Sequence, residues 1–146
     1  MKSLVLLMFV VLFTGCSSVK KGPTFDGVSL GACPASPNCV SSLEEREGKH
    51  YLEEIGYRGS REEAVADILE AVKMEKNYEI VTEREDYIHV IFRSGFFKFI
   101  DDLELYLPED ERGIHFRSAA RSGYSDFGVN RKRVERIRER FEARER

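Results

Sequence analysis

Apolar and polar residues alternate along five stretches of the chain, with the period of two that is typical of β-strands. In the first stretch this alternation is imperfect. Glu85 and Asp86 separate the second stretch from the third, which indicates a hairpin. The predicted strands are residues 51–58, 78–84, 87–94, 100–107 and 113–119.

Two other stretches carry apolar residues at the spacing of an amphipathic helix. The first is 61–74, where Ser60 and Glu63 form a capping box at the helix start. The second begins near Asn130, an acceptable N-cap, and its apolar residues are Val134, Ile137 and Phe141. Strands bracketed by two helices predict an α+β fold, with a mostly antiparallel sheet of four to five strands and two packed helices.

The N-terminus has the pattern of an export signal. Lys2 precedes an apolar run over 4–13, which is too short to cross a bilayer as a helix, since a span needs about 20 residues. The run ends in the residues FTGC, which resemble a bacterial lipobox in which Cys16 becomes the lipidated N-terminus. Leucine is commoner than Phe13 at its position, so an ordinary cleaved signal peptide is the alternative.

These features divide the chain into a lipoprotein signal peptide over 1–15, a tether over 16–24 and a single domain over 25–146. Lipid on Cys16 predicts a protein anchored in the bacterial cell envelope, with the membrane as its partner. The two serines after Cys16 lack the aspartate of an inner-membrane retention signal. In a cell with two membranes we therefore expect the periplasmic face of the outer membrane.

Charge is distributed unevenly along the chain. The formal net charge is −3, but residues 131–146 hold eight basic and four acidic residues and so carry +4. A basic end is compatible with nucleic-acid binding. Export and the interleaved glutamates favour a solvated helix face with i to i+4 ion pairs, so we expect no nucleic-acid partner.

Cys33 and Cys39 remain once Cys16 is assigned to the lipid. In an exported protein two such cysteines favour a disulfide, which would pin the N-terminal loop rich in Gly, Pro and Ser. Their Cys-x5-Cys spacing matches neither a Cys-x2-Cys redox pair nor a complete set of metal ligands, and we predict no metal or cofactor. The pinned loop would serve as a lead-in to the domain or line a pocket.

The strand faces that point away from the predicted core gather histidines, acids and arginines. Such groups can perform acid/base chemistry or bind an anion, but a solvated face with cross-strand charge pairs is the simpler interpretation. Asp101 and Asp102 are neighbours and so point to opposite faces, and one of them is expected to pair with an arginine. The residues of this face are His89, Arg93, Asp102, Glu104, His115 and Arg117.

Residues 117–138 join the last strand to the last helix and gather basic side chains around a Gly-x-x-Asp-x-Gly turn. Asp126 is expected to cap nearby amides or to pair with an arginine. The helix start behind it would suit a carboxylate or phosphate. The candidate ligand-binding residues are Arg117, Arg121, Asp126, Asn130 and Arg131.

Two functions are compatible with these residues. The leading hypothesis is a non-enzymatic binding or interaction module of the envelope, which would take a partner protein or a small anionic ligand at this anion-compatible site. The alternative is a hydrolase or transferase that uses Asp102, His115 and neighbouring arginines.

Two segments resemble the signatures of the family called Domain of Unknown Function 1499 (DUF1499). They are CPASPNCVSS over 33–42 and the stretch 99–138, which contains RSAARSGYSDFGVNR. The resemblance implies a small α+β domain of exported or membrane-associated proteins, with no established activity. Ala120 stands where the family often has serine, which speaks against that hydroxyl as an obligatory nucleophile. The matching positions are Cys33, Pro34, Pro37, Asn38, Cys39, Asp101, Asp102, Arg117, Ser118, Arg121, Gly123, Asp126, Gly128, Asn130 and Arg131.

Overall fold

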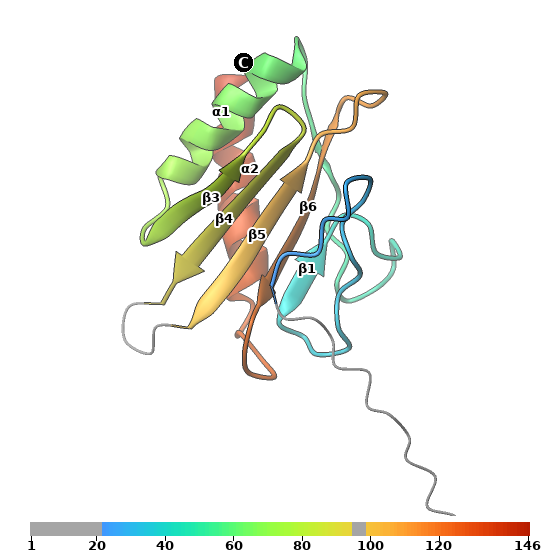
Figure 1. Cartoon of the computed structure of the whole chain (residues 1–146), viewed down its shortest axis with the longest axis vertical. Helices are drawn as coiled ribbons and strands as arrows, with labels where there is room; N and C mark the ends of the chain where they lie inside the picture. Colours follow the sequence, from blue (N-terminus) through green and yellow to red (C-terminus); the bar gives the residue numbers. More distant parts are fainter. Residues whose placement is uncertain (1–21, 95–98) are drawn as a thin grey trace, which may run out of the picture.

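The fold combines two helices with a six-stranded antiparallel sheet (Figure 1). The computed structural model describes residues 22–94 and 99–146, so the leader, Cys16 and most of the tether lie outside the described residues. Neither helix in these ranges is long and apolar enough to cross a membrane. The elements are β1 (Cys39–Ser41), β2 (Ile55–Gly56), α1 (Arg61–Lys73), β3 (Tyr78–Glu83), β4 (Tyr87–Arg93), β5 (Ile100–Tyr106), β6 (Gly113–Ala120) and α2 (Val129–Arg144).

The strands lie in the order β1-β6-β5-β4-β3, and β2 also pairs with β6. The α+β fold, both helices and the four strands after residue 78 are confirmed. The prediction of a full strand over 51–58 is wrong, because only Ile55–Gly56 pairs, and β1 lies within the loop that was expected to be irregular. Both short strands use the same edge of β6, where β1 takes residues 117–119 and β2 takes 113–114, so each has room for only a few pairs.

The two helix starts differ in how closely they follow the prediction. The Ser60 capping box at α1 is confirmed, since Ser60 accepts the Glu63 amide hydrogen and the Glu63 carboxylate accepts that of Ser60. Helix α2 begins earlier than expected. Its N-cap is Gly128, which has a left-handed φ of 76°, and Asn130 already lies within the helix.

The helices cover one face of the sheet and bury its apolar residues (Figure 1). The strand side chains on this face alternate with those of the opposite face, as the period of two requires. Helix α2 packs against both α1 and β6. The residues buried here include Ile88, Val90, Phe92, Leu103, Leu105, Ile114 and Phe116 of the strands and Val134, Ile137 and Phe141 of α2.

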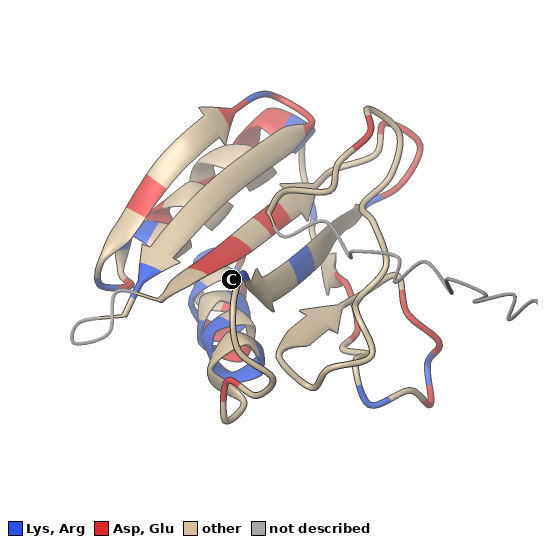
Figure 2. Cartoon of the chain, turned by 60° about the horizontal axis from the view of Figure 1, so that its bottom comes forward, with Lys and Arg blue, Asp and Glu red and all other residues tan. Residues whose placement is uncertain are grey.

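The opposite face is not the solvated surface that its polar residues predict. The N-terminal segment, residues 22–38, lies across the β5 and β6 side of it and leads into β1, which pairs with β6 at the edge of the sheet. Figure 2 shows acidic positions of β5 beside a basic position of β6. Arg93 is exposed and His115 half-buried, but the other four polar residues of this face are buried. Those four are His89, Asp102, Glu104 and Arg117.

Glu104 holds the N-terminal segment onto this face. Its carboxylate is completely buried and accepts hydrogen bonds from the Thr24 amide (2.6 Å), the Phe25 amide (2.9 Å) and the Thr24 hydroxyl (2.9 Å). The Tyr87 hydroxyl donates a fourth bond at 3.0 Å. Burial and the nearby Glu104 carboxylate raise the pKa of Tyr87, so this hydroxyl keeps its proton and remains a donor. These contacts begin at Thr24, the last residue of the predicted tether.

Replacement of this carboxylate should loosen the N-terminal segment. Glu104→Gln places an amide donor where acceptors are required and leaves Arg117 buried without a carboxylate, so we expect the free energy of unfolding to fall by about 3 kcal/mol or more. Urea denaturation measures this loss, and hydrogen exchange at Thr24 and Phe25 should accelerate.

The matched control is Glu79→Gln, which removes an exposed carboxylate that pairs with Arg93. An exposed pair contributes about 1 kcal/mol at most. Equal losses in the two variants would contradict the role assigned to Glu104.

Candidate functional site

A small cavity lies at the end of the sheet where β6 leaves the sheet and turns toward α2. Its volume is about 200 Å³, and it is bounded by β5, β6, the turn after β6 and the loop closed by Cys33 and Cys39. Gly22, the first described residue, also lines it. The side chains that bring polar groups to its walls are Ser36, Asn38, Asp102, Arg117 and Arg121.

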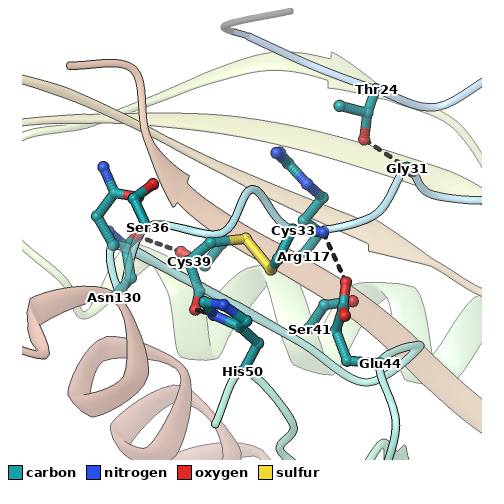
Figure 3. Close-up of a disulfide and its surroundings, with 12 residues drawn as sticks. Thr24, Gly31, Cys33, Ser36, Cys39, Ser41, Glu44, His50, Arg117 and Asn130 are labelled. Atoms are coloured by element: carbon teal, nitrogen blue, oxygen red, sulfur yellow. Dashed lines mark hydrogen bonds between the residues drawn. A yellow bond between two sulfur atoms is a disulfide. The ribbon is translucent and has the colours of Figure 1, made fainter. Parts of the chain in front are cut away.

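The disulfide loop forms one wall of the cavity. The Cys33–Cys39 bridge confirms the predicted disulfide, and Figure 3 shows Arg117 beside it. Asn38 fixes the loop to the turn after β6, because its side-chain amide donates to the Gly123 carbonyl at 2.6 Å. The Ser36 hydroxyl donates to Asn38 Oδ1 at 2.7 Å. The pinned loop therefore lines a pocket, which is one of the two roles expected for it.

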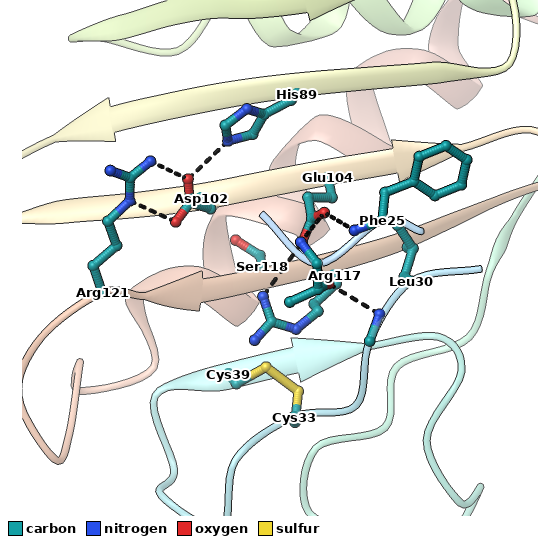
Figure 4. Close-up of polar contacts among 12 residues, drawn as sticks. Phe25, Leu30, Cys33, Cys39, His89, Asp102, Glu104, Arg117, Ser118 and Arg121 are labelled. Carbon is teal, nitrogen blue, oxygen red and sulfur yellow. Dashed lines mark hydrogen bonds and ion pairs between the residues drawn. A yellow bond between two sulfur atoms is a disulfide. The ribbon is translucent and has the colours of Figure 1, made fainter. Parts of the chain in front are cut away.

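Asp102 lies on the opposite wall and is held by two partners (Figure 4). Arg121 donates to both of its carboxylate oxygens, at 2.8 and 2.7 Å, and His89 Nε2 lies 2.7 Å from Oδ1. Burial alone would raise the pKa of Asp102, but the hydrogen bonds to Arg121 and His89 outweigh it and lower the pKa below its ordinary value. Asp102 is therefore ionised at neutral pH.

Arg117 is the least satisfied charged group of the cavity. The residue is only 3% exposed, and its one ion pair is a long contact of 3.4 Å from Nη1 to Glu104 Oε2. Its Nε is buried and has no hydrogen-bond partner among the described residues. In Figure 4 the guanidinium lies between Glu104 and the disulfide. Arg117 thus lines the cavity with a desolvated positive charge and has one donor that no described residue uses.

The other three candidate ligand-binding residues do not line this cavity. Asp126 accepts hydrogen bonds from the backbone amides of Gly128 (3.0 Å) and Asn130 (2.9 Å), so it caps α2 as expected. The alternative role, a pair with an arginine, is not found, since none of the ion pairs among the described residues involves Asp126. The acidic side chain itself fills the helix start that was expected to suit an anionic ligand.

Asn130 and Arg131 connect α2 to the rest of the fold. Asn130 is buried, and its Oδ1 accepts hydrogen bonds from the Ser118 hydroxyl and from Arg133 Nη1. Arg131 donates to the backbone carbonyls of Lys49 and Tyr51, at 2.8 and 2.9 Å. Of the five candidates, the structure therefore brings only Arg117 and Arg121 together at a cavity.

The two neighbouring aspartates of β5 point to opposite faces, as predicted. Asp101 pairs with Arg133 of α2 at 2.8 Å on the helix side, and Asp102 pairs with Arg121 on the other side. One aspartate was expected to meet an arginine, and both do. Each charge is neutralised within its own layer of the fold.

Asp102 and His115 are too far apart to exchange a proton directly. His115 lies opposite Tyr106, which is four residues along β5 from Asp102, or about 13 Å at the rise of a β-strand. His115 instead contacts Glu111 through Nε2 (2.8 Å) and the Ser42 hydroxyl through Nδ1 (3.2 Å). The Ser42 oxygen also accepts the Phe116 amide hydrogen, which ties it to the backbone.

Two cavity residues, Ser36 and Asn38, are absent from the set of candidates chosen from the sequence. Both lie in the cysteine-flanked CPASPNC segment, so that segment was the available signal, but the partner of Asn38 lies 85 positions away at Gly123. No group of three or more His, Cys, Asp or Glu residues within 22–94 and 99–146 is arranged to hold a metal ion.

The lowered pKa of Asp102 predicts a stability difference that depends on pH. A carboxylate with a lowered folded-state pKa stabilises the fold above its unfolded-state pKa of about 3.9, and this contribution is lost as the pH falls through the folded-state pKa. The difference in unfolding free energy between the wild type and Asp102→Asn should therefore be largest at neutral pH and shrink below about pH 4. Urea denaturation over a pH series measures it.

Asp110→Asn is the control, because Asp110 is exposed in the turn between β5 and β6. Its effect should stay within about 0.5 kcal/mol. A difference for Asp102→Asn that remains constant down to the acid limit would contradict the assignment of its ion pair.

Comparison with known proteins places the chain in a family. The family described as "Protein of unknown function (DUF1499)" matches residues 29–141, which include β1 to β6 and most of α2. No curated protein and no solved structure matches the chain. The matched range contains the disulfide loop, Asp102 and both arginines of the cavity. The chain therefore belongs to the DUF1499 family.

Proposed function

We propose that this protein is an exported lipoprotein of the bacterial envelope whose domain binds a small anionic group in the cavity at Arg117 and Arg121. The observation that carries the proposal is Arg117, which lines the cavity, is buried and weakly paired, and has an Nε without a hydrogen-bond partner among the described residues. A buried donor without a partner costs about 1–3 kcal/mol. An anion that accepts a hydrogen bond from this guanidinium would recover that cost.

The hydrogen bonding around the cavity supports an anionic ligand over a cationic one. Asp102 is already held by Arg121 on both oxygens, and Glu104 accepts four hydrogen bonds besides its contact with Arg117. The two carboxylates therefore have little hydrogen-bonding capacity left, whereas Arg117 still has an N–H group without a partner among the described residues. A guanidinium also suits the planar, bidentate geometry of carboxylate and phosphate oxygens.

The size of the cavity limits what it can accept. A volume of about 200 Å³ is below the range of about 300–1,000 Å³ that is usual for pockets of drug-sized ligands. We therefore propose a carboxylate or phosphate, either as a small molecule or as the head of a larger one. The Asn38 and Ser36 side chains would supply the neutral polar contacts.

A binding role has more support than catalysis through Asp102 and His115. The two groups lie about 13 Å apart along the sheet. Asp102 is ionised and held by Arg121 and His89, so it has no proton to give as a general acid.

Removal of the candidate donor should abolish anion binding. With phosphate and acetate as probes, we expect the melting temperature of the wild type to rise saturably with one of them, relative to chloride at equal ionic strength. The stabilisation would reach about 2.7 kcal/mol at a hundred times Kd. Arg117→Gln should lose this shift. Arg117→Lys should retain only part of it, because lysine keeps the positive charge but lacks the paired N–H donors of the guanidinium.

Arg131→Gln is the matched control, since Arg131 is a candidate from the sequence that lies outside the cavity. Each variant is compared with its own melting temperature in chloride, so a general loss of stability does not affect the result. A shift that survives in Arg117→Gln, or no shift in the wild type with either probe, would contradict the proposed ligand site.

The lipid anchor is tested separately. Cys16→Ala removes the acceptor for lipid, so the exported protein should move from the membrane fraction to the soluble fraction. Fractionation followed by immunoblotting measures the distribution. Membrane association that is unchanged in this variant would refute the anchor and leave the anion site untouched.

A further inference from the structure

The turn between β6 and α2 presents exposed apolar side chains. This turn with the first residue of α2, residues 121–129, is termed here the aromatic loop. Phe127 is 90% exposed and Tyr124 is 74% exposed, and Val129 beside them is also exposed. Phe127 has the largest exposed fraction of the large apolar residues within 22–94 and 99–146. A cluster of this kind in one loop is typical of a contact surface.

The loop holds Phe127 in an unusual conformation. Its φ is 55°, in the left-handed region that bulky residues rarely adopt. The neighbouring residues maintain this geometry, because Ser125 Oγ accepts the Phe127 amide hydrogen and Asp126 accepts those of Gly128 and Asn130. The ring is thus held outward by a hydrogen-bonded turn, and such strain is often found at functional positions.

The aromatic loop lies at the end of the domain from which the N-terminus departs. Gly22 and Gly123 line the same cavity, so the first described residue lies near this loop. Figure 1 shows the connection from β6 to α2 at the lower end of the sheet, toward which the chain before β1 also runs. Cys16 precedes Gly22 by six residues, which span about 20 Å at most when fully extended.

We infer that the aromatic loop is a membrane-contact surface, on which Phe127 and Tyr124 enter the interface of the bilayer that holds the anchor. This inference rests on the lipid anchor of the proposed function. A tether of about 20 Å keeps the loop within reach of the bilayer and gives this surface a high effective concentration. Aromatic rings, and tyrosine in particular, are enriched at the level of the lipid headgroups.

This contact orients the domain. With the aromatic loop on the bilayer, the cavity lined by Arg121 and Gly123 lies beside the headgroup region. The opposite end of the sheet, where Phe25 stacks on Tyr87 with ring centroids 4.3 Å apart, faces away from the membrane. The turn at Asp26–Ser29, which contains the 75% exposed Val28, is then an apolar position remote from the bilayer.

Site-directed fluorescence quenching tests the contact. Phe127→Cys and Val28→Cys are made separately in the full chain and labelled with an environment-sensitive fluorophore. Because Cys33 and Cys39 are bridged, each variant gains one accessible thiol, and the unsubstituted chain gives the background labelling. The labelled proteins are placed on vesicles of phosphatidylethanolamine and phosphatidylglycerol whose acyl chains carry a nitroxide.

We expect nitroxide to quench the label at position 127 several-fold more than the label at position 28, and aqueous iodide to show the reverse order. Equal quenching at the two positions would overturn the inference. So would a label at position 127 that is shielded from both quenchers, because a protein partner or a second copy would then cover the loop.

Flotation of the same samples tests the lipid anchor independently of the membrane contact of the aromatic loop. Protein that floats with the vesicles without selective quenching at position 127 retains the anchor and overturns the membrane contact. Exported protein that carries no lipid on Cys16, but is still quenched selectively at position 127 when vesicles are added, supports the contact and removes the anchor.

Discussion

The buried carboxylate of Glu104 is the contact on which the second layer of this fold depends. It accepts the backbone amides of Thr24 and Phe25 and so connects the start of the domain to a central strand eighty positions later. Water cannot replace these bonds because the carboxylate is completely buried. The N-terminal segment, the disulfide loop and the wall of the cavity all lie over the face that Glu104 fixes.

This arrangement produces the cavity as well as the fold. Two acids and two arginines share the covered face, and their charges balance, but their hydrogen bonds do not. Glu104 accepts most of its hydrogen bonds from the N-terminal segment. Arg117 is left with a single long ion pair, in which its Nη1 lies 3.4 Å from Glu104 Oε2. Asp102, in contrast, is satisfied by Arg121 and His89. Because the hydrogen bonds are distributed unequally among these four charged groups, Arg117 is the group through which the cavity can attract an anion.

The aromatic loop and the cavity share one end of the domain, and both depend on the turn after β6. Asp126 organises that turn by capping α2, and Gly123 accepts the hydrogen bond from Asn38 that fixes the disulfide loop. The residues 117–138 therefore act first as a structural joint. Of the candidate ligand-binding residues in this stretch, only Arg117 and Arg121, at the β6 side of that joint, line the cavity.

The sequence by itself determined the strands after residue 78, both helices, the disulfide and the opposite orientations of Asp101 and Asp102. The strands, the helices and the aspartate orientations follow from local spacing, which a linear pattern records. The disulfide follows from the two cysteines that remain in a chain with an export signal. Only the tertiary structure decided that the polar face is covered, that β1 and β2 share the edge of β6, and that Arg117 retains an unused donor at Nε. Alternating polar residues look the same whether solvent or paired charges surround them, and hydrogen-bond partners that fix this part of the fold lie 80 to 85 positions apart.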